Sequence, residues 1–102
     1  MAWDTQWWTL VENAYTACVD SESDRWLLFK QTSLQHPILQ YTCVADEAKR
    51  VCKLSKDQIK AEVCAKLSRA FPKVDIPEPV DVLATGWDDN PLYLGAYSFM
   101  PV

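Results

Sequence analysis

The sequence of 102 residues is long enough for one small domain, and its 49% hydrophobic content is ordinary for a folded protein. The formal net charge is −4 and the Lys and Arg residues form no block that could neutralise phosphates, which argues against nucleic-acid binding. No apolar run approaches the roughly 20 residues that span a bilayer, and no basic leader with an apolar stretch marks a signal peptide.

The N-terminal quarter is rich in aromatic residues. Helical spacing predicts a helix over residues 4–19, with apolar positions at Trp8, Val11, Tyr15 and Cys18. The aromatic and β-branched content leaves a strand near Trp7 and Trp8 open. For Trp3, Trp7 and Trp8 we favour a protein-partner interface over a core, because chain termini seldom carry a core.

A β-hairpin is predicted next. A polar turn over residues 20–24 precedes a buried strand at 26–30. Gln35-His36-Pro37 makes the connecting turn, because Pro37 restricts the residue before it. A second strand over 38–44 then pairs with the first.

Two helices follow, of which the second has the clearest pattern. Asp46 opens a short helix that runs to about Leu54. Ser55-Lys56-Asp57-Gln58 has the form of a capping box, and the amphipathic helix behind it is stopped by Pro72. Apolar residues recur on one face of this helix, at Ile59, Val63, Leu67, Ala70 and Phe71.

The C-terminal part is predicted as an extended connector and a strand. Pro77 and Pro79 stiffen the connector, a third strand runs from Val80 to Trp87, and residues 89–91 break the chain. Strands and helices that are grouped rather than alternating predict an α+β fold in a single partial domain, divided into residues 1–25 and 26–102.

Cysteine and histidine patterns give no catalytic or metal site. The only His is His36, and no CxxC pair occurs among Cys18, Cys43, Cys52 and Cys64. We interpret the four cysteines as small reduced core residues, which is typical of an intracellular protein, with import into an organelle left open. The acidic pair Asp88-Asp89 is interpreted as a solvated turn.

Residues 26–102 resemble the flavin-containing amine oxidases, a family with monoamine oxidases, polyamine oxidases and lysine-specific histone demethylases. The strand-to-helix run 42–48 and the capped helix followed by Ile76-Pro77-Glu78-Pro79-Val80 carry part of the resemblance. Residues 85–99 carry most of it: the family pattern is Thr-Arg-Trp, two variable residues, Asp-Pro, three more, then Gly-Ser-Tyr-Ser and an aromatic residue. The spacing of Trp87, Pro91, Gly95 and Tyr97 agrees without a gap.

The resemblance implies part of a substrate-binding domain, with a partial mixed sheet and flanking helices. In the family, this domain positions an amine that loses a hydride to FAD, while the cofactor carries the redox chemistry. By position, Trp87 corresponds to a tryptophan near the flavin ring and Tyr97 to an aromatic residue that flanks the amine. Core packing is the alternative for both residues.

Several departures argue against catalysis by this chain alone. Gly86, Asn90 and Leu94 replace an Arg, an Asp and an Arg of the family, and Ala96 stands where some members carry a flavin-bonded cysteine. Gly86 and Gly95 are the only glycines, so no GxGxxG turn exists to hold a dinucleotide. The family's active-site lysine and its late glycine-rich stretch would lie outside residues 1–102.

Two hypotheses follow. The first is a non-catalytic, amine-oxidase-derived accessory subunit of a larger protein assembly, without a cofactor or metal of its own. The alternative is a fragment of an FAD-dependent polyamine or monoamine oxidase whose flavin-binding part is elsewhere.

Overall fold

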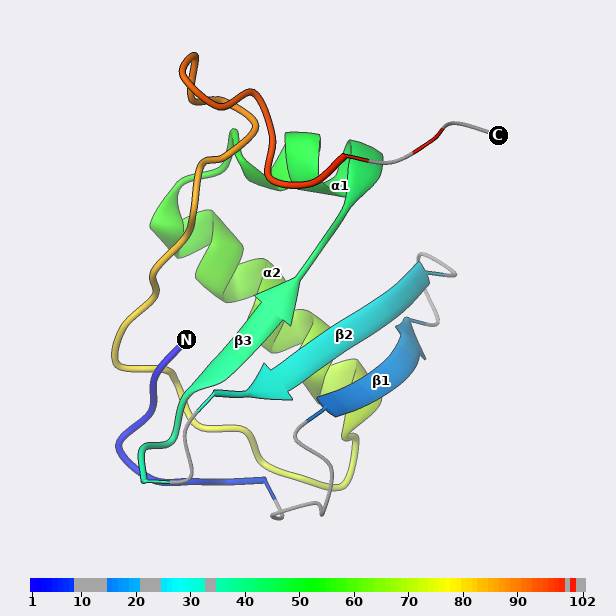
Figure 1. Cartoon of the computed structure of the whole chain (residues 1–102). Coiled ribbons are helices and arrows are strands. Elements are labelled where there is room, and N and C mark those ends of the chain that lie inside the picture. The colour runs from blue at the N-terminus through cyan, green and yellow to red at the C-terminus, as the bar shows by residue number, and fades with distance from the viewer. Residues whose placement is uncertain (9–14, 21–24, 33–34, 99, 101–102) are drawn as a thin grey trace.

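The computed structural model describes residues 1–8, 15–20, 25–32, 35–98 and 100, with the backbone alone described for 15–20 and 25–27. Three strands form a sheet in the order β1-β2-β3, with β1 at Tyr15–Asp20, β2 at Arg25–Gln31 and β3 at Leu39–Thr42. Two helices follow, α1 at Ala45–Val51 and α2 at Lys56–Ala70. Helix α2 lies across one face of the sheet (Figure 1). The predicted α+β class is confirmed.

The hairpin prediction is confirmed by the pairing of β2 and β3. These strands are antiparallel, with Phe29 opposite Tyr41, and Ile38 donates its N–H to the carbonyl of His36 in the turn at 2.8 Å. Strands β1 and β2 are also antiparallel, so both pairings of the described sheet have this direction. A mixed sheet would also contain parallel strand pairs, and the described sheet contains none.

The helix predicted over residues 4–19 is wrong where the structure describes it. Residues 15–20 form β1 and residues 4–8 are not helical, while 9–14 lie outside the described part. Tyr15, Thr16 and Val19 are aromatic or β-branched and lose rotamer freedom in a helix. Pairing with β2 satisfies the backbone instead, and this pairing crosses the boundary between the two predicted segments, 1–25 and 26–102.

The strand predicted from Val80 to Trp87 is also wrong. Only Asp81 pairs, through an isolated bridge to Ala2, and no residue from 82 to 87 is in a strand. The reason is the length of the available partner, because among the described residues the backbone of Ala2 is what bonds to this stretch, at Val80 and Asp81. Residues 83–87 bond to no strand within the part of the chain that the structure describes, and Leu83 is 83% exposed.

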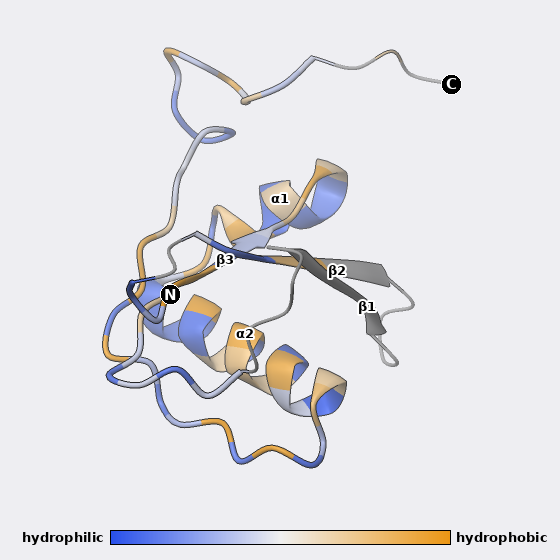
Figure 2. Ribbon diagram, turned by 60° about the horizontal axis from the view of Figure 1, so that its bottom comes forward, coloured by the Kyte–Doolittle hydropathy of each residue, from blue (hydrophilic) through white to orange (hydrophobic). Residues whose placement is uncertain are grey.

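Helix α2 forms as its sequence predicts. The Ser55 hydroxyl accepts a 3.2 Å hydrogen bond from the Gln58 N–H, and the Gln58 side chain accepts a 2.9 Å bond from the Ser55 N–H. This reciprocal pair satisfies two donors at a helix start. Polar and apolar residues of α2 lie on different sides (Figure 2).

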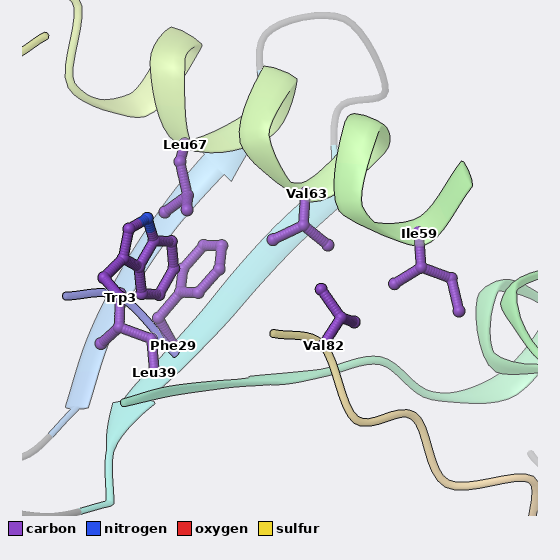
Figure 3. Close-up of a cluster of buried hydrophobic side chains, with 7 residues drawn as sticks. All are labelled: Trp3, Phe29, Leu39, Ile59, Val63, Leu67 and Val82. Carbon is purple, nitrogen blue, oxygen red and sulfur yellow. The ribbon is translucent and has the colours of Figure 1, made fainter. Parts of the chain in front are cut away.

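The core lies between α2, the sheet and two further segments, one with Trp3 and one with Val82. Ile59, Val63 and Leu67 of α2 point toward the other buried side chains, as Figure 3 shows. Leu67 is fully buried. The remaining members come from four different parts of the chain: Trp3, Phe29, Leu39 and Val82.

Candidate functional site

The residues that the sequence singles out for amine binding lie in a segment that leaves the core. Val82 is buried, but Leu83 and almost every apolar side chain after it are exposed. Figure 2 shows this segment extending away from α2 and the sheet. We call residues 86–97 the aromatic loop.

Asn90 organises the aromatic loop through its backbone and its side chain. Its N–H donates to the Gly86 carbonyl at 3.0 Å, and its own carbonyl accepts from Tyr93 at 3.0 Å and Leu94 at 2.9 Å. Its Oδ1 accepts from the Leu92 N–H at 3.0 Å, as is typical of an Asx turn. An aspartate could accept the same bond, so Asn90 preserves the role available to the residue it replaces. The Asn-Pro step was the sequence signal for this turn.

The end of the loop needs an unusual backbone. Gly95 has φ 143°, a conformation that L side chains rarely adopt, and Leu94 has φ 53°, which is uncommon outside glycine. The Gly95 N–H donates to the Trp87 carbonyl at 2.9 Å and closes the loop. Gly95 is therefore required by conformation, and Leu94 is a strained position.

Trp87 and Tyr97 are both accessible, but the ring contact of Trp87 is with Tyr93. The centroids of Trp87 and Tyr93 are 5.1 Å apart at an interplanar angle of 85°, an edge-to-face contact. Trp87 is 45% exposed and Tyr97 is 93% exposed. Core packing, the alternative for both, therefore does not describe them within this chain. Their amine-facing role stays a prediction, and Tyr93 joins the candidates.

The described residues do not fit a dinucleotide. Glycines at such sites let the backbone approach a pyrophosphate closely. A Cβ added at Gly86 or Gly95 would meet nothing within 4 Å, so neither glycine lies in a tight cradle. At the start of α2, the Gln58 amide is already bound by Ser55. Nothing in the described part of this chain is built to hold FAD.

The N-terminal tryptophans pack against one another and against the core. Trp3 is 4% exposed, and its ring centroid lies 5.6 Å from Trp7 and 5.7 Å from Trp8. Trp7 also contacts Phe71 at 5.9 Å, and Trp7 and Trp8 are half-buried. Trp3 is thus a core residue of this chain, contrary to the partner-interface interpretation, because the N-terminal backbone is paired on both sides. A partner role for Trp7 and Trp8 stays a prediction.

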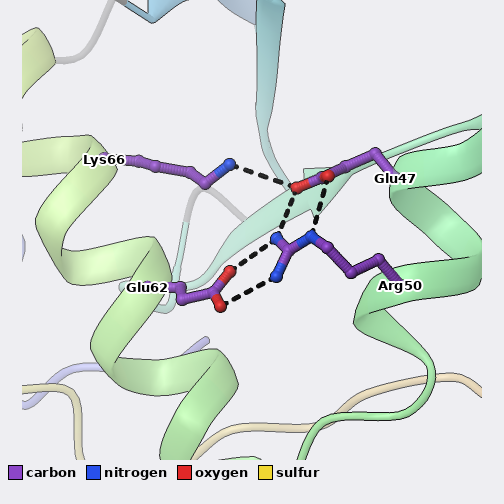
Figure 4. Close-up of polar contacts among 4 residues, drawn as sticks. All are labelled: Glu47, Arg50, Glu62 and Lys66. Carbon is purple, nitrogen blue, oxygen red and sulfur yellow. Dashed lines mark hydrogen bonds and ion pairs between the residues drawn. The ribbon is translucent and has the colours of Figure 1, made fainter. Parts of the chain in front are cut away.

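An ion-pair cluster joins α1 to α2 (Figure 4). Arg50 binds both Glu47 and Glu62, with shortest distances of 2.7 Å to each carboxylate, and Lys66 lies 3.3 Å from Glu47. Hydrogen bonding from Arg50 lowers the pKa of Glu47 to about 2, and bonding to Glu62 raises the pKa of Arg50. Lys66, which is 8% exposed, also lies 5.7 Å from the Tyr41 ring centroid. The cluster holds the two helices together.

Cys43, Cys52 and Cys64 are free thiols that are half-buried, so the structure does not place them in the core as predicted, and the side chain of Cys18 lies outside the described part. Burial is the largest cause that raises the pKa of Cys43 and of Cys64, which disfavours the reactive thiolate. Among the residues that the structure describes, no group of His, Cys, Asp and Glu side chains could hold a metal ion. Neither α1 nor α2 is long and apolar enough to cross a membrane.

Comparison with known proteins extends the resemblance over almost the whole chain. The family described as flavin containing amine oxidoreductase matches residues 3–102. Polyamine oxidase 1 of Zea mays is 31% identical over 77 residues, which cover 76% of this chain and 15% of that protein. Probable polyamine oxidase 4 of Arabidopsis thaliana is 28% identical over 99 residues, 97% of this chain and 20% of the relative.

A rice relative, polyamine oxidase 7 of Oryza sativa subsp. japonica, is 26% identical over 77 residues, 76% of this chain and 16% of the relative. The chain therefore spans between 15% and 20% of the length of these three relatives. A family match that includes β1, the hairpin, both helices and the aromatic loop covers every element described above. This chain belongs to the flavin-containing amine oxidoreductase family.

Proposed function

We propose that this chain is the amine-side part of an FAD-dependent amine oxidase that acts on polyamines, with its flavin-binding part elsewhere. The observation that carries the proposal is the similarity to polyamine oxidases over 76–97% of the chain. The aromatic loop adds support, because Trp87, Tyr93 and Tyr97 are exposed on a segment matched by the family.

The comparisons favour this proposal over the accessory-subunit hypothesis. Each of the three relatives named above is a polyamine oxidase, and none is described as a structural subunit. The exposed aromatic rings of the loop also favour amine binding over a purely structural role. An aromatic face is electron-rich, so it attracts an ammonium group or stacks against the carbon chain beside it.

In this proposal, the residues of this chain bind and orient the substrate. Trp87, which is in edge-to-face contact with Tyr93, presents an aromatic surface. Tyr97 adds a second surface beyond the turn that Gly95 closes. Bound FAD supplies the oxidation, and its binding residues lie outside the described part of this chain.

The direct experiment uses the native protein that contains these 102 residues. It is mixed anaerobically with a linear polyamine while the long-wavelength flavin absorbance is followed. The proposal predicts bleaching of that band. A flavin band that stays unchanged with polyamines would contradict the assignment of substrate class, and a protein without flavin would contradict the oxidase assignment itself.

The role of the aromatic loop is tested in the same assay. Trp87→Ala and Tyr97→Ala should each slow the bleaching at least tenfold, because a misplaced substrate loses most of the benefit of orientation. Leu83→Ala is the control, since Leu83 is 83% exposed and lies before the loop. Equal rates for all three variants would remove Trp87 and Tyr97 from the site.

A further inference from the structure

The first three residues are hydrogen-bonded on both sides. On one side, Leu39 donates its N–H to the Met1 carbonyl at 3.0 Å, and the Met1 amino group donates to the Leu39 carbonyl at 2.7 Å. On the other side, Ala2 donates to the Asp81 carbonyl at 3.0 Å and accepts from the Val80 N–H at 2.8 Å. Residues 1–3 therefore join β3 to the connector that follows α2.

Trp3 joins the same two parts of the chain, through its backbone on one side and its side chain on the other. Its backbone N–H donates to the Pro37 carbonyl at 3.0 Å, next to the hairpin turn. Its indole Nε1 donates to the Pro77 carbonyl at 2.8 Å. Because the ring is 4% exposed, water competes little for this donor, and the bond gains strength from its surroundings.

The aromatic loop begins directly after this link. Val82 is buried against the core, and the chain is exposed from Leu83 onward. In the described part of the chain, the hydrogen bonds of residues 86–95 join these residues to one another. The loop keeps its own shape, but its direction is set where it leaves the core, at residues 80–82.

We propose that residues 1–3 are a positioning element for the aromatic loop, because they fix the connector at the point where the loop departs. The importance of this position for amine oxidation rests on the proposed function, whereas the mechanical coupling does not. An ion pair between Lys60 and Glu78 also reaches the connector, but the Glu78 side chain is 80% exposed, so this pair gives the connector little further support.

The test is amide hydrogen exchange of the full chain carrying Trp3→Phe. This substitution keeps an aromatic ring in the core and removes the donor to Pro77. Exchange at the amides of Val80 and Asp81 should become about three- to tenfold faster, as expected for the loss of one hydrogen bond. Exchange at Ile59 in α2 and at Phe71, which caps the C-terminal end of α2, should stay unchanged.

Trp8→Phe is the matched control. The Trp8 indole belongs to the same cluster, but its Nε1 donates to Gln31 Oε1 in the sheet at 3.1 Å, so exchange at Val80 and Asp81 should not change. A second pair of variants changes Ala2. Ala2→Pro removes the N–H that donates to the Asp81 carbonyl, and Ala2→Gly keeps it. Only the proline variant should accelerate exchange there beyond the change at α2.

Two results would overturn the proposal. One is unchanged exchange at Val80 and Asp81 in both Trp3→Phe and Ala2→Pro. The other is an equal acceleration at α2, which would mean that Trp3 and Ala2 act only on global stability. A native protein without flavin would sink the proposed function and leave this exchange result intact, so the two failures are distinguishable.

Discussion

The guanidinium of Arg50 in α1 binds both carboxylate oxygens of Glu62 in α2, at 2.9 and 2.7 Å. Arg50 also binds Glu47 within its own helix, so one side chain connects two carboxylates. Bidentate pairs of this kind add geometric specificity to charge attraction. Because α1 has seven residues, contributes no fully buried side chain and packs against the core only through the partly buried Val51, we expect this cluster to help fix its place on α2.

Replacing Glu47 with Gln tests the cluster through pH. The pKa of Glu47 is about 2 in the folded chain and 4.5 ordinarily, so its stabilisation is fully present above pH 4.5 and is lost as the pH falls toward 2. Glu47→Gln should lower the free energy of unfolding by about 1 kcal/mol at neutral pH, discounted for the exposure of Arg50. It should also flatten the acid limb of the stability curve, measured by urea denaturation.

Glu78→Gln is the control for this experiment. Glu78 pairs with Lys60, but its side chain is 80% exposed, so neutralising it should leave the acid limb almost unchanged. Equal flattening by both substitutions would mean that the pH dependence does not come from the cluster.

Ala45→Gly should stabilise the chain, against the usual effect of glycine. Ala45 has φ 54°, a left-handed conformation that costs an L residue about 1–2 kcal/mol and costs glycine little. The gain should be about 0.5–1 kcal/mol in the free energy of unfolding. Ala65→Gly in the exposed middle of α2 should instead cost about 1 kcal/mol. If both variants changed the free energy of unfolding in the same direction, the left-handed conformation of Ala45 would be contradicted.

Ser55→Ala tests the start of α2. It removes the acceptor for the Gln58 N–H and should cost about 1 kcal/mol in chemical denaturation. Ser68→Ala changes the same residue type at an exposed position within α2 and should be neutral or slightly stabilising, because alanine favours helices. A similar loss at both positions would show that the cap contributes nothing.

Leu67→Ala tests the centre of the core. Leu67 is fully buried, so its truncation should cost about 3 kcal/mol through lost burial and the cavity left behind. Leu83→Ala makes the same chemical change at a side chain that is 83% exposed and should stay within about 0.5 kcal/mol. Thermal unfolding of the two variants separates these outcomes.

The elements that local signals specify are the ones that the sequence predicts correctly. The capping box at Ser55 and Gln58 lies within one turn, and the hairpin needs only a turn at Pro37 between two apolar runs. The Asn90 turn is equally local, and its Asn-Pro signal indicated a break but not the four hydrogen bonds around it.

The features that the sequence does not reveal depend on distant partners. Strand β1 has helical spacing, and its pairing with β2, together with its aromatic and β-branched residues, favours a strand. Trp3 is buried because segments 74 residues apart meet there, through its bond to Pro77. Arg50 binds Glu62 on another helix, and the spacing rules for side-chain pairs within one helix do not predict such a contact.

Whether this chain functions together with a flavin-binding part is measured by size-exclusion chromatography of the native protein, with flavin absorbance recorded and peptides identified in each fraction. We expect peptides from these 102 residues to elute together with a flavin band and with peptides of a dinucleotide-binding sequence. Elution of these peptides in fractions without flavin would contradict this expectation.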